Sequence, residues 1–97
     1  MRRARADTDP IAADRPQEPT RLALVQRRDC ELCEHMLMQL EMLARSLTLP
    51  PLDVLDVDAD AELLRRYGLH VPVLLLDGEV VCRHRLDVPE LKRLLRL

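Results

Sequence analysis

The order of apolar segments after residue 20 constrains the fold of this chain more than any other feature. Short apolar runs are typical of buried strands, and here they alternate with segments whose apolar residues recur every three or four positions, as on one helix face. The predicted strands are 22–25, 52–57, 71–76 and 80–83, and the predicted helices are 32–47, a short stretch ending at 67, and 88–95. Strand-helix-strand units favour parallel pairing with right-handed crossovers, and the final hairpin adds an antiparallel strand. The sequence therefore predicts an α/β fold in the order βαβαββα, with a four-stranded mixed sheet and three helices.

Residue types at the ends of these segments support their boundaries. Pro50-Pro51 ends the first helix, because neither proline can continue it. Asp58 or Asp60 is placed to cap the second helix, and Gly68 follows its end, where a left-handed conformation is common. Asp77-Gly78 is a dipeptide favoured in the tight turn of a hairpin.

Composition divides the chain into two parts. Residues 1–20 contain three prolines, mixed charge and almost no large aliphatic side chains, so we expect a flexible tail there. Residues 21–97 suffice for one domain, and 21 leucines with one tyrosine, no tryptophan and no phenylalanine predict an aliphatic core. The stripe of leucine and methionine from Leu32 to Leu47 should contribute to that core.

Charge and hydropathy exclude two classes of partner. The net charge is −2 with acidic and basic residues interspersed, and a single aromatic residue, Tyr67, cannot stack a series of bases. The longest apolar run, 71–76, is far shorter than the roughly 20 residues that span a bilayer. Arg2-Arg3 is not followed by the apolar stretch of an export signal. We therefore expect a cytoplasmic protein that binds neither nucleic acid nor membrane, and we expect a monomer.

Two of the three cysteines, Cys30 and Cys33, form a C-x-x-C motif where the first predicted strand gives way to the first helix. The free N–H groups and positive dipole end of a helix stabilise a thiolate, and they lower a cysteine pKa from about 8.5 to between roughly 3.5 and 7.5. A second sulfur one turn inside the helix can attack a mixed disulfide formed on the first. Because cytosolic thiols are kept reduced, the spacing favours a redox or metal function over a structural disulfide.

Metal binding and an inert pair remain alternatives for this motif. A structural zinc site needs four ligands and often two such pairs, whereas this chain has one pair. Cys82 and a histidine could complete a site, but His35 lies two residues past Cys33 and points away from it on a helix. We predict no metal site, a small buried side chain for Cys82, and exposed positions for His35, His70 and His84.

The combined motifs resemble those of the thioredoxin superfamily, and more narrowly those of the small glutaredoxin-like proteins of bacteria. The matching residues are Cys30-Glu31-Leu32-Cys33, the segment DVDADAELLRRYGLHVPVLLLDG at 56–78, and Arg85-Leu86-Asp87. The resemblance spans 21–97 and implies a thioredoxin-like fold and a thiol-disulfide oxidoreductase with Cys30 as nucleophile and Cys33 as resolving cysteine. It also implies that the Val71-Pro72 bond is cis, lies beside the cysteine pair and leaves the Val71 backbone available to an extended substrate.

Partners follow from the same resemblance. The expected substrates are protein disulfides or glutathione mixed disulfides, with no bound cofactor and with glutathione as a candidate reductant. The competing hypothesis is a non-catalytic thioredoxin-fold binding module that uses the groove at Pro72 without turnover.

The sequence departs from the family pattern at two places. Glu31-Leu32 stands between the cysteines, where glutaredoxins commonly have proline and an aromatic residue, and Cys82-Arg83-His84-Arg85 replaces a Gly-Gly turn. The Glu31 carboxylate opposes the helix dipole and should make the Cys30 thiol less acidic than in a typical glutaredoxin. Arg27 and Arg28 are expected to act in the opposite direction.

Overall fold

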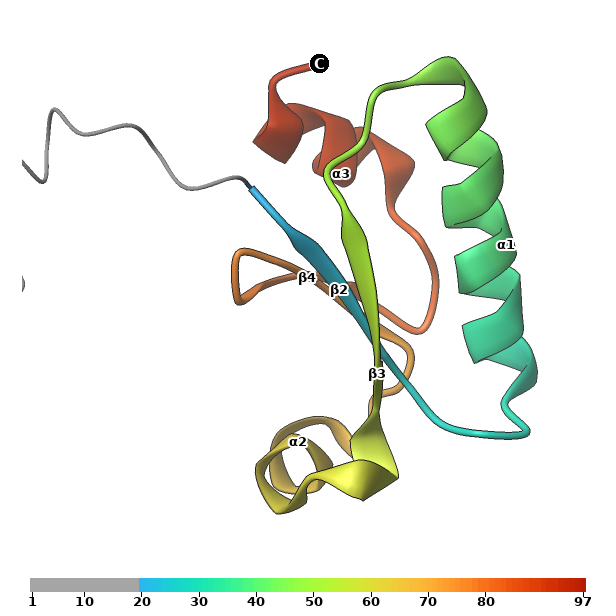
Figure 1. Cartoon of the computed structure of the whole chain (residues 1–97), viewed down its shortest axis with the longest axis vertical. Coiled ribbons are helices and arrows are strands. Elements are labelled where there is room, and N and C mark those ends of the chain that lie inside the picture. Colours follow the sequence, from blue (N-terminus) through green and yellow to red (C-terminus); the bar gives the residue numbers. More distant parts are fainter. Residues whose placement is uncertain (1–19) are drawn as a thin grey trace, which may run out of the picture.

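A computed structural model of the chain describes residues 20–97 and contains a four-stranded sheet with helices on both faces (Figure 1). The strands are β2 (Leu22–Gln26), β3 (Leu52–Asp56), β4 (Val73–Leu76) and β5 (Glu79–Arg83). The helices are α1 (Glu31–Ser46), α2 (Ala61–Tyr67) and α3 (Val88–Leu95), with a short 3₁₀ helix, η2 (Val57–Ala59), after β3. The predicted order βαβαββα is confirmed, and η2 is an addition that the sequence did not indicate. The flexible tail predicted for 1–20 lies, apart from Thr20, outside the described residues.

β2 lies in the interior of the sheet, whose strand order is β3-β2-β4-β5. It runs parallel to β3 and antiparallel to β4, with Val25 opposite Val73. β5 pairs antiparallel to β4, and the register shifts between Leu74 and Leu75. This is the predicted mixed sheet, in which α1 supplies the crossover that parallel strands need and a tight turn joins the last two strands.

An aliphatic core covers each face of the sheet. On one face, residues of α1 and α3 pack on the strands, and the buried members are Leu22, Leu24, Met36, Leu40, Leu74 and Leu91. On the other face, η2 and α2 pack on the strands, and the buried members are Val25, Val57, Tyr67, Val73 and Leu75. β2 and β4 contribute to both cores because successive side chains of a strand point to opposite faces. Within residues 20–97, no helix is long and apolar enough to cross a membrane.

α1 begins where the sequence predicts, but its buried face is narrower than predicted. Cys30 is its N-cap residue, and the helix ends at Ser46, shortly before Pro50-Pro51. Its buried residues are Cys33, Met36 and Leu40. The expectation that Leu32 lies in the core was wrong, since 39% of its surface is exposed. Leu32 is one position away from the stripe that faces the sheet, and this offset turns it towards the rim.

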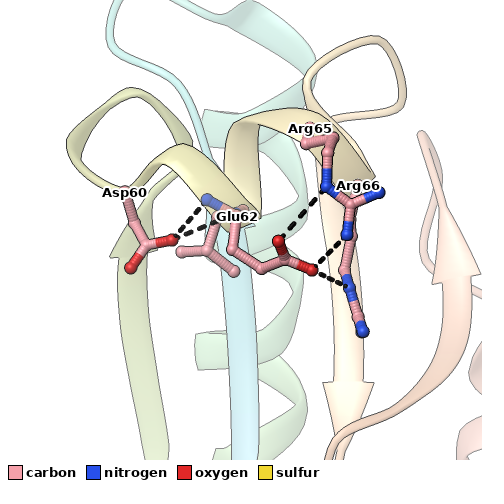
Figure 2. A network of polar contacts seen from close by, with 5 residues as sticks. Asp60, Glu62, Arg65 and Arg66 are labelled. Atoms are coloured by element: carbon pink, nitrogen blue, oxygen red, sulfur yellow. Dashed lines mark hydrogen bonds and ion pairs between the residues drawn. The ribbon is translucent and has the colours of Figure 1, made fainter.

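Charged side chains organise α2, as Figure 2 shows. Asp60 is the N-cap, and its Oδ1 accepts hydrogen bonds from the backbone N–H groups of Glu62 and Leu63 at 2.8 and 3.0 Å. The Glu62 carboxylate then accepts hydrogen bonds from the guanidinium groups of Arg65 and Arg66. These hydrogen bonds lower the pKa of Glu62, and the bond from Arg65 has the larger effect. Of the two aspartates predicted as caps for this helix, Asp60 is the one used.

Gly68 follows α2, but it does not adopt the left-handed conformation that its position suggested. Its φ and ψ angles are −55° and −30°, and its N–H donates to the carbonyl oxygen of Leu64 at 2.9 Å. A Cβ at this position would lie 2.6 Å from that oxygen. The close approach of the Leu64 backbone, rather than a positive φ, therefore explains the glycine.

Asp77 and Gly78 form the two-residue turn between β4 and β5, as predicted. Their φ angles are 50° and 87°, and a turn with both central residues in the left-handed region matches the twist of a hairpin. The turn is tied to the start of β2, because the Asp77 N–H donates to the Arg21 carbonyl and the Asp77 Oδ1 accepts from the Arg21 N–H, both at 2.9 Å.

We expect Gly78→Ala to lower the free energy of unfolding by about 1 kcal/mol, because a Cβ is disfavoured at a left-handed φ. Among the described residues, nothing lies within 4 Å of the added Cβ position, so the loss comes from the backbone. Urea denaturation followed by circular dichroism, with the cysteine pair kept oxidised, measures the change. Gly78→Asn is the matched control and should lose less, since asparagine tolerates this region. Equal losses in the two variants would contradict this explanation.

Candidate functional site

β2 leads into α1 at one end of the sheet (Figure 1), and the cysteine pair lies at this junction, with Cys30 as the N-cap of α1. Arg28 and Asp29 form the connecting turn, and Asp29 has a φ of 55°. Cys30 and Cys33 are joined by a disulfide, with their Cα atoms 5.2 Å apart. The pair is therefore in the oxidised state, the form that a dithiol takes after it has given up two electrons.

The two sulfur atoms have different surroundings. Cys30 caps α1 and is half-buried, whereas Cys33, one turn further on, has 1% of its surface exposed. The backbone N–H of Cys33 donates to the Sγ of Cys30 at 3.2 Å. A thiolate at Cys30 would retain this donor and the positive dipole end of α1, so the position favours the ionised form. The arrangement agrees with the predicted outer and inner positions of the pair.

The Val71-Pro72 segment lies at the same end of the sheet as the cysteine pair. Its peptide bond is cis, as the resemblance implies. Because Val25 pairs with Val73, extending the antiparallel register by one residue places Pro72 beside Gln26, the last residue of β2. His84, just past β5, donates its N–H to the Pro72 carbonyl oxygen at 2.7 Å. The topology thus brings together two segments that are far apart in the sequence.

Arg27, which was expected to favour the Cys30 thiolate, is bound to other groups. Its Nε and Nη2 donate to the carboxylate oxygens of Asp58 at 2.9 and 3.2 Å, and its Nη1 donates to the Gly68 carbonyl oxygen at 3.0 Å. The hydrogen bond with Asp58 raises the pKa of Arg27 and lowers that of Asp58. Arg28, which is exposed in the turn before Cys30, remains the candidate for an effect on the thiolate.

An open groove of about 400 Å³ runs along the exposed side of α1 next to the cysteine motif. It is lined by Glu31, Leu32, Glu34, His35, Met38 and Arg85. All of these except Arg85 come from the first half of α1, and Arg85 comes from the connection between β5 and α3. Carboxylates, a guanidinium and apolar side chains occur together, so the groove can contact both polar and apolar groups of a polypeptide.

Cys82 is a free cysteine outside the pair. It is half-buried on β5 and packs against the core that α1 and α3 form with the sheet. Burial raises the pKa of its thiol, so Cys82 stays protonated at neutral pH. In the part of the chain from 20 to 97, no three His, Cys, Asp or Glu side chains are placed to hold a metal ion.

Two features of this region were not indicated by the sequence. His70 and His84, both exposed, lie edge to face with ring centroids 6.2 Å apart, and His84 has a left-handed φ of 68°. The second feature is the pair of contacts made by Arg27. Its partners lie 31 and 41 positions further along the chain, so no local pattern could reveal them.

Comparison with known proteins places these features in a family. A family model for a glutaredoxin-like domain (DUF836) matches residues 21–96. The solution structure of protein Ne2328 from Nitrosomonas europaea is similar, with a TM-score of 0.70 and 29% identity over 82% of this chain and 95% of that one. The X-ray structure of target protein XcR50 from X. campestris is also similar, with a TM-score of 0.57 and 34% identity over 77% of this chain and 95% of that one.

The fold extends to thioredoxins. The oxidised form of mitochondrial thioredoxin 3 from Saccharomyces cerevisiae matches with a TM-score of 0.57 and 16% identity over 82% of this chain and 79% of that one, which confirms the thioredoxin-like fold. A search of curated proteins found no match. Because the family model matches residues 21–96, which are nearly all of the described residues, this chain belongs to the glutaredoxin-like (DUF836) family.

Proposed function

We propose that this protein is a thiol-disulfide oxidoreductase of the glutaredoxin or thioredoxin type. The observation that carries the proposal is the asymmetry of the pair. Cys30 lies at the start of α1 with an N–H donor on its sulfur, and Cys33 is buried one turn further in. This arrangement supports an outer thiolate that attacks a substrate and an inner thiol that a large substrate cannot reach.

The reaction needs no group other than the two cysteines, a substrate disulfide and a reductant. In the reduced protein, the Cys30 thiolate attacks one substrate sulfur, forms a mixed disulfide and displaces the other substrate sulfur, which takes up a proton. Cys33 then loses its proton and attacks the Cys30 Sγ, which releases the remaining substrate thiolate and forms the Cys30–Cys33 disulfide. Two electrons pass to the substrate. Two molecules of an external thiol, for which glutathione is the candidate, then reduce the Cys30–Cys33 disulfide through a mixed disulfide and leave as their own disulfide, which restores the dithiol.

Protein disulfides and glutathione mixed disulfides are the proposed substrates. The Val71-Pro72 segment, at the same end of the sheet as the pair, supports the binding of an extended substrate along the Val71 backbone. The groove along α1 offers additional contacts for a polypeptide. A reducing compartment keeps the pair available as a dithiol, and we therefore propose a cytoplasmic location.

Redox titration separates this function from that of a binding module without turnover. We expect the pair to interconvert reversibly between dithiol and disulfide in a two-electron transition near the cytosolic glutathione poise, about −220 to −320 mV. Mass spectrometry after rapid alkylation in defined thiol buffers measures the oxidised fraction. A pair that stays reduced throughout this range would favour the binding module.

Trapping of mixed disulfides tests the separate roles of the cysteines. Cys33→Ser should accumulate mixed disulfides on Cys30, because no second thiol is available to release the substrate. Cys30→Ser should accumulate few, because the remaining Cys33 thiol is buried. Non-reducing electrophoresis after incubation with a disulfide-bonded peptide measures both. Equal trapping by the two variants would show that the roles are assigned wrongly.

Alkylation rates test the effect of Glu31 on the outer thiol. Removing its negative charge in Glu31→Gln should increase the thiolate fraction of Cys30 and speed its alkylation at pH 7 by about two- to fivefold. Cys82 is an internal reference in the same mass spectra, because burial raises the pKa of its thiol and keeps its labelling slow.

Glu41→Gln is the matched control for this measurement. It removes a carboxylate of α1 that is also exposed. The ten-residue separation from Glu31 corresponds to about 15 Å along a helix, beyond the Debye length of roughly 10 Å at 0.1 M salt. It should leave the Cys30 rate unchanged. Preferential labelling of Cys33 would show that the roles of the two cysteines are assigned wrongly, and an equal change in both variants would contradict the electrostatic explanation.

A further inference from the structure

Arg27 connects three segments at the functional end of the sheet. Its position immediately after β2 brings it next to η2, where both Asp58 carboxylate oxygens accept from Nε and Nη2 at 2.9 and 3.2 Å. On its other side, Nη1 donates at 3.0 Å to the carbonyl oxygen of Gly68, at the end of α2. The last carbonyl groups of a helix have no partner within it, so the guanidinium satisfies one of them. Because one planar guanidinium makes both contacts, it restricts the movement of η2 and the end of α2 relative to each other.

The chain segments that follow Arg27 and Gly68 contain the residues that the proposed reaction uses. Arg27 is followed by the turn of Arg28 and Asp29 and then by Cys30, while Gly68 is followed by two residues and then by Val71-Pro72. The turn after β2 and α2 lie at the same end of the sheet in Figure 1. One side chain therefore joins the segment that carries the outer sulfur to the segment that precedes the cis peptide bond.

We propose that Arg27 is a positioning residue that holds the Val71-Pro72 segment in place relative to Cys30. Its guanidinium is occupied by Asp58 and Gly68, so it acts through these neighbours and not on the reacting sulfur atoms. The inference rests on the proposed oxidoreductase function and adds a residue that matters for polypeptide substrates in particular. A substrate bound along the Val71 backbone depends on the distance between that segment and Cys30, whereas a small disulfide that needs only the sulfur does not.

The chain supplies a matched control at the other end of β2. Arg21 makes the same kind of two-bond contact with Asp53, at 3.1 Å from Nε and 2.9 Å from Nη2. The exposures are comparable, with 52% and 48% for the Arg21–Asp53 side chains and 36% and 50% for Arg27–Asp58. The Arg21 pair is at the end of β2 away from the cysteines, and its guanidinium has no further acceptor among residues 20–97. Arg21→Gln therefore removes a similar ion pair without releasing the Val71-Pro72 segment.

The experiment compares the full-length wild-type protein with Arg27→Gln, Asp58→Asn and Arg21→Gln. The two substrates are a disulfide-bonded peptide of about ten residues and bis(2-hydroxyethyl) disulfide, and circular dichroism first establishes a temperature at which every variant is folded. We expect Arg27→Gln to raise the KM for the peptide about tenfold, with kcat and the rate with bis(2-hydroxyethyl) disulfide unchanged. Asp58→Asn keeps the Gly68 hydrogen bond and should have a smaller effect. Arg21→Gln should match the wild type.

Amide hydrogen exchange gives a readout that does not depend on turnover. Arg27→Gln should speed exchange at Gly68 and His70, whose N–H groups donate to the carbonyl oxygens of Leu64 and Tyr67 at 2.9 and 2.8 Å, and Arg21→Gln should not. Unchanged peptide KM and unchanged exchange in Arg27→Gln would overturn the positioning role, as would an equal loss in Arg21→Gln or an equal loss with both substrates. A wild-type protein that reduces neither disulfide would instead overturn the proposed function, and altered exchange alone would then leave Arg27 a structural residue only.

Discussion

The pairing of β2 with β3 on one side and β4 on the other determines where the cysteine pair and the Val71-Pro72 segment lie. The end of β2 leads to the turn before Cys30, and the antiparallel register with β4 places Pro72 next to Gln26. A slip of one residue between β2 and β4 would exchange the two faces of the strand and move Pro72 by about 3.3 Å along it. Buried residues on both faces oppose such a slip, since Leu24 belongs to one core and Val25 to the other. The geometry of the site is therefore a consequence of core packing.

The spacing of the C-x-x-C motif serves the core as well as the chemistry. Cys33 lies three residues before Met36, and both face the sheet on the buried stripe of α1. Cys30 is one turn earlier, at the N-cap, where the unpaired N–H groups of the helix are available to its sulfur. A single helix thus gives two identical side chains different exposure and different electrostatic surroundings. This difference is the physical basis for the two roles in the proposed reaction.

Tertiary contacts give the two adjacent arginines near the cysteine pair different roles. Arg27 and Arg28 are adjacent in the sequence and looked equivalent as neighbours of a thiolate. In the fold, Arg27 is held between Asp58 and the Gly68 carbonyl, whereas Arg28 is exposed in the turn. A guanidinium with fixed hydrogen-bond partners holds those partners in place, whereas the charge of an exposed guanidinium is screened by salt. The inferred positioning role of Arg27 follows from this distinction.

Local features of the sequence were sufficient to predict the element order, the Asp77-Gly78 turn and the location of the cysteine pair at a strand-helix junction. Each of these features depends on residues that are close together in the sequence, where hydrophobic periodicity and the residue types of turns decide the local structure. The cis state of Val71-Pro72 came from the family resemblance, because proline alone leaves trans the commoner form.

Only the tertiary structure decided which predicted side chains reach the core and which groups meet at the site. Leu32 followed a helical pattern yet lies at the rim, with 39% of its surface exposed. The contacts of Arg27 join positions separated by 31 and 41 residues. Sequence periodicity describes one element at a time, whereas these outcomes depend on how elements pack against one another, and that packing is determined by the whole fold.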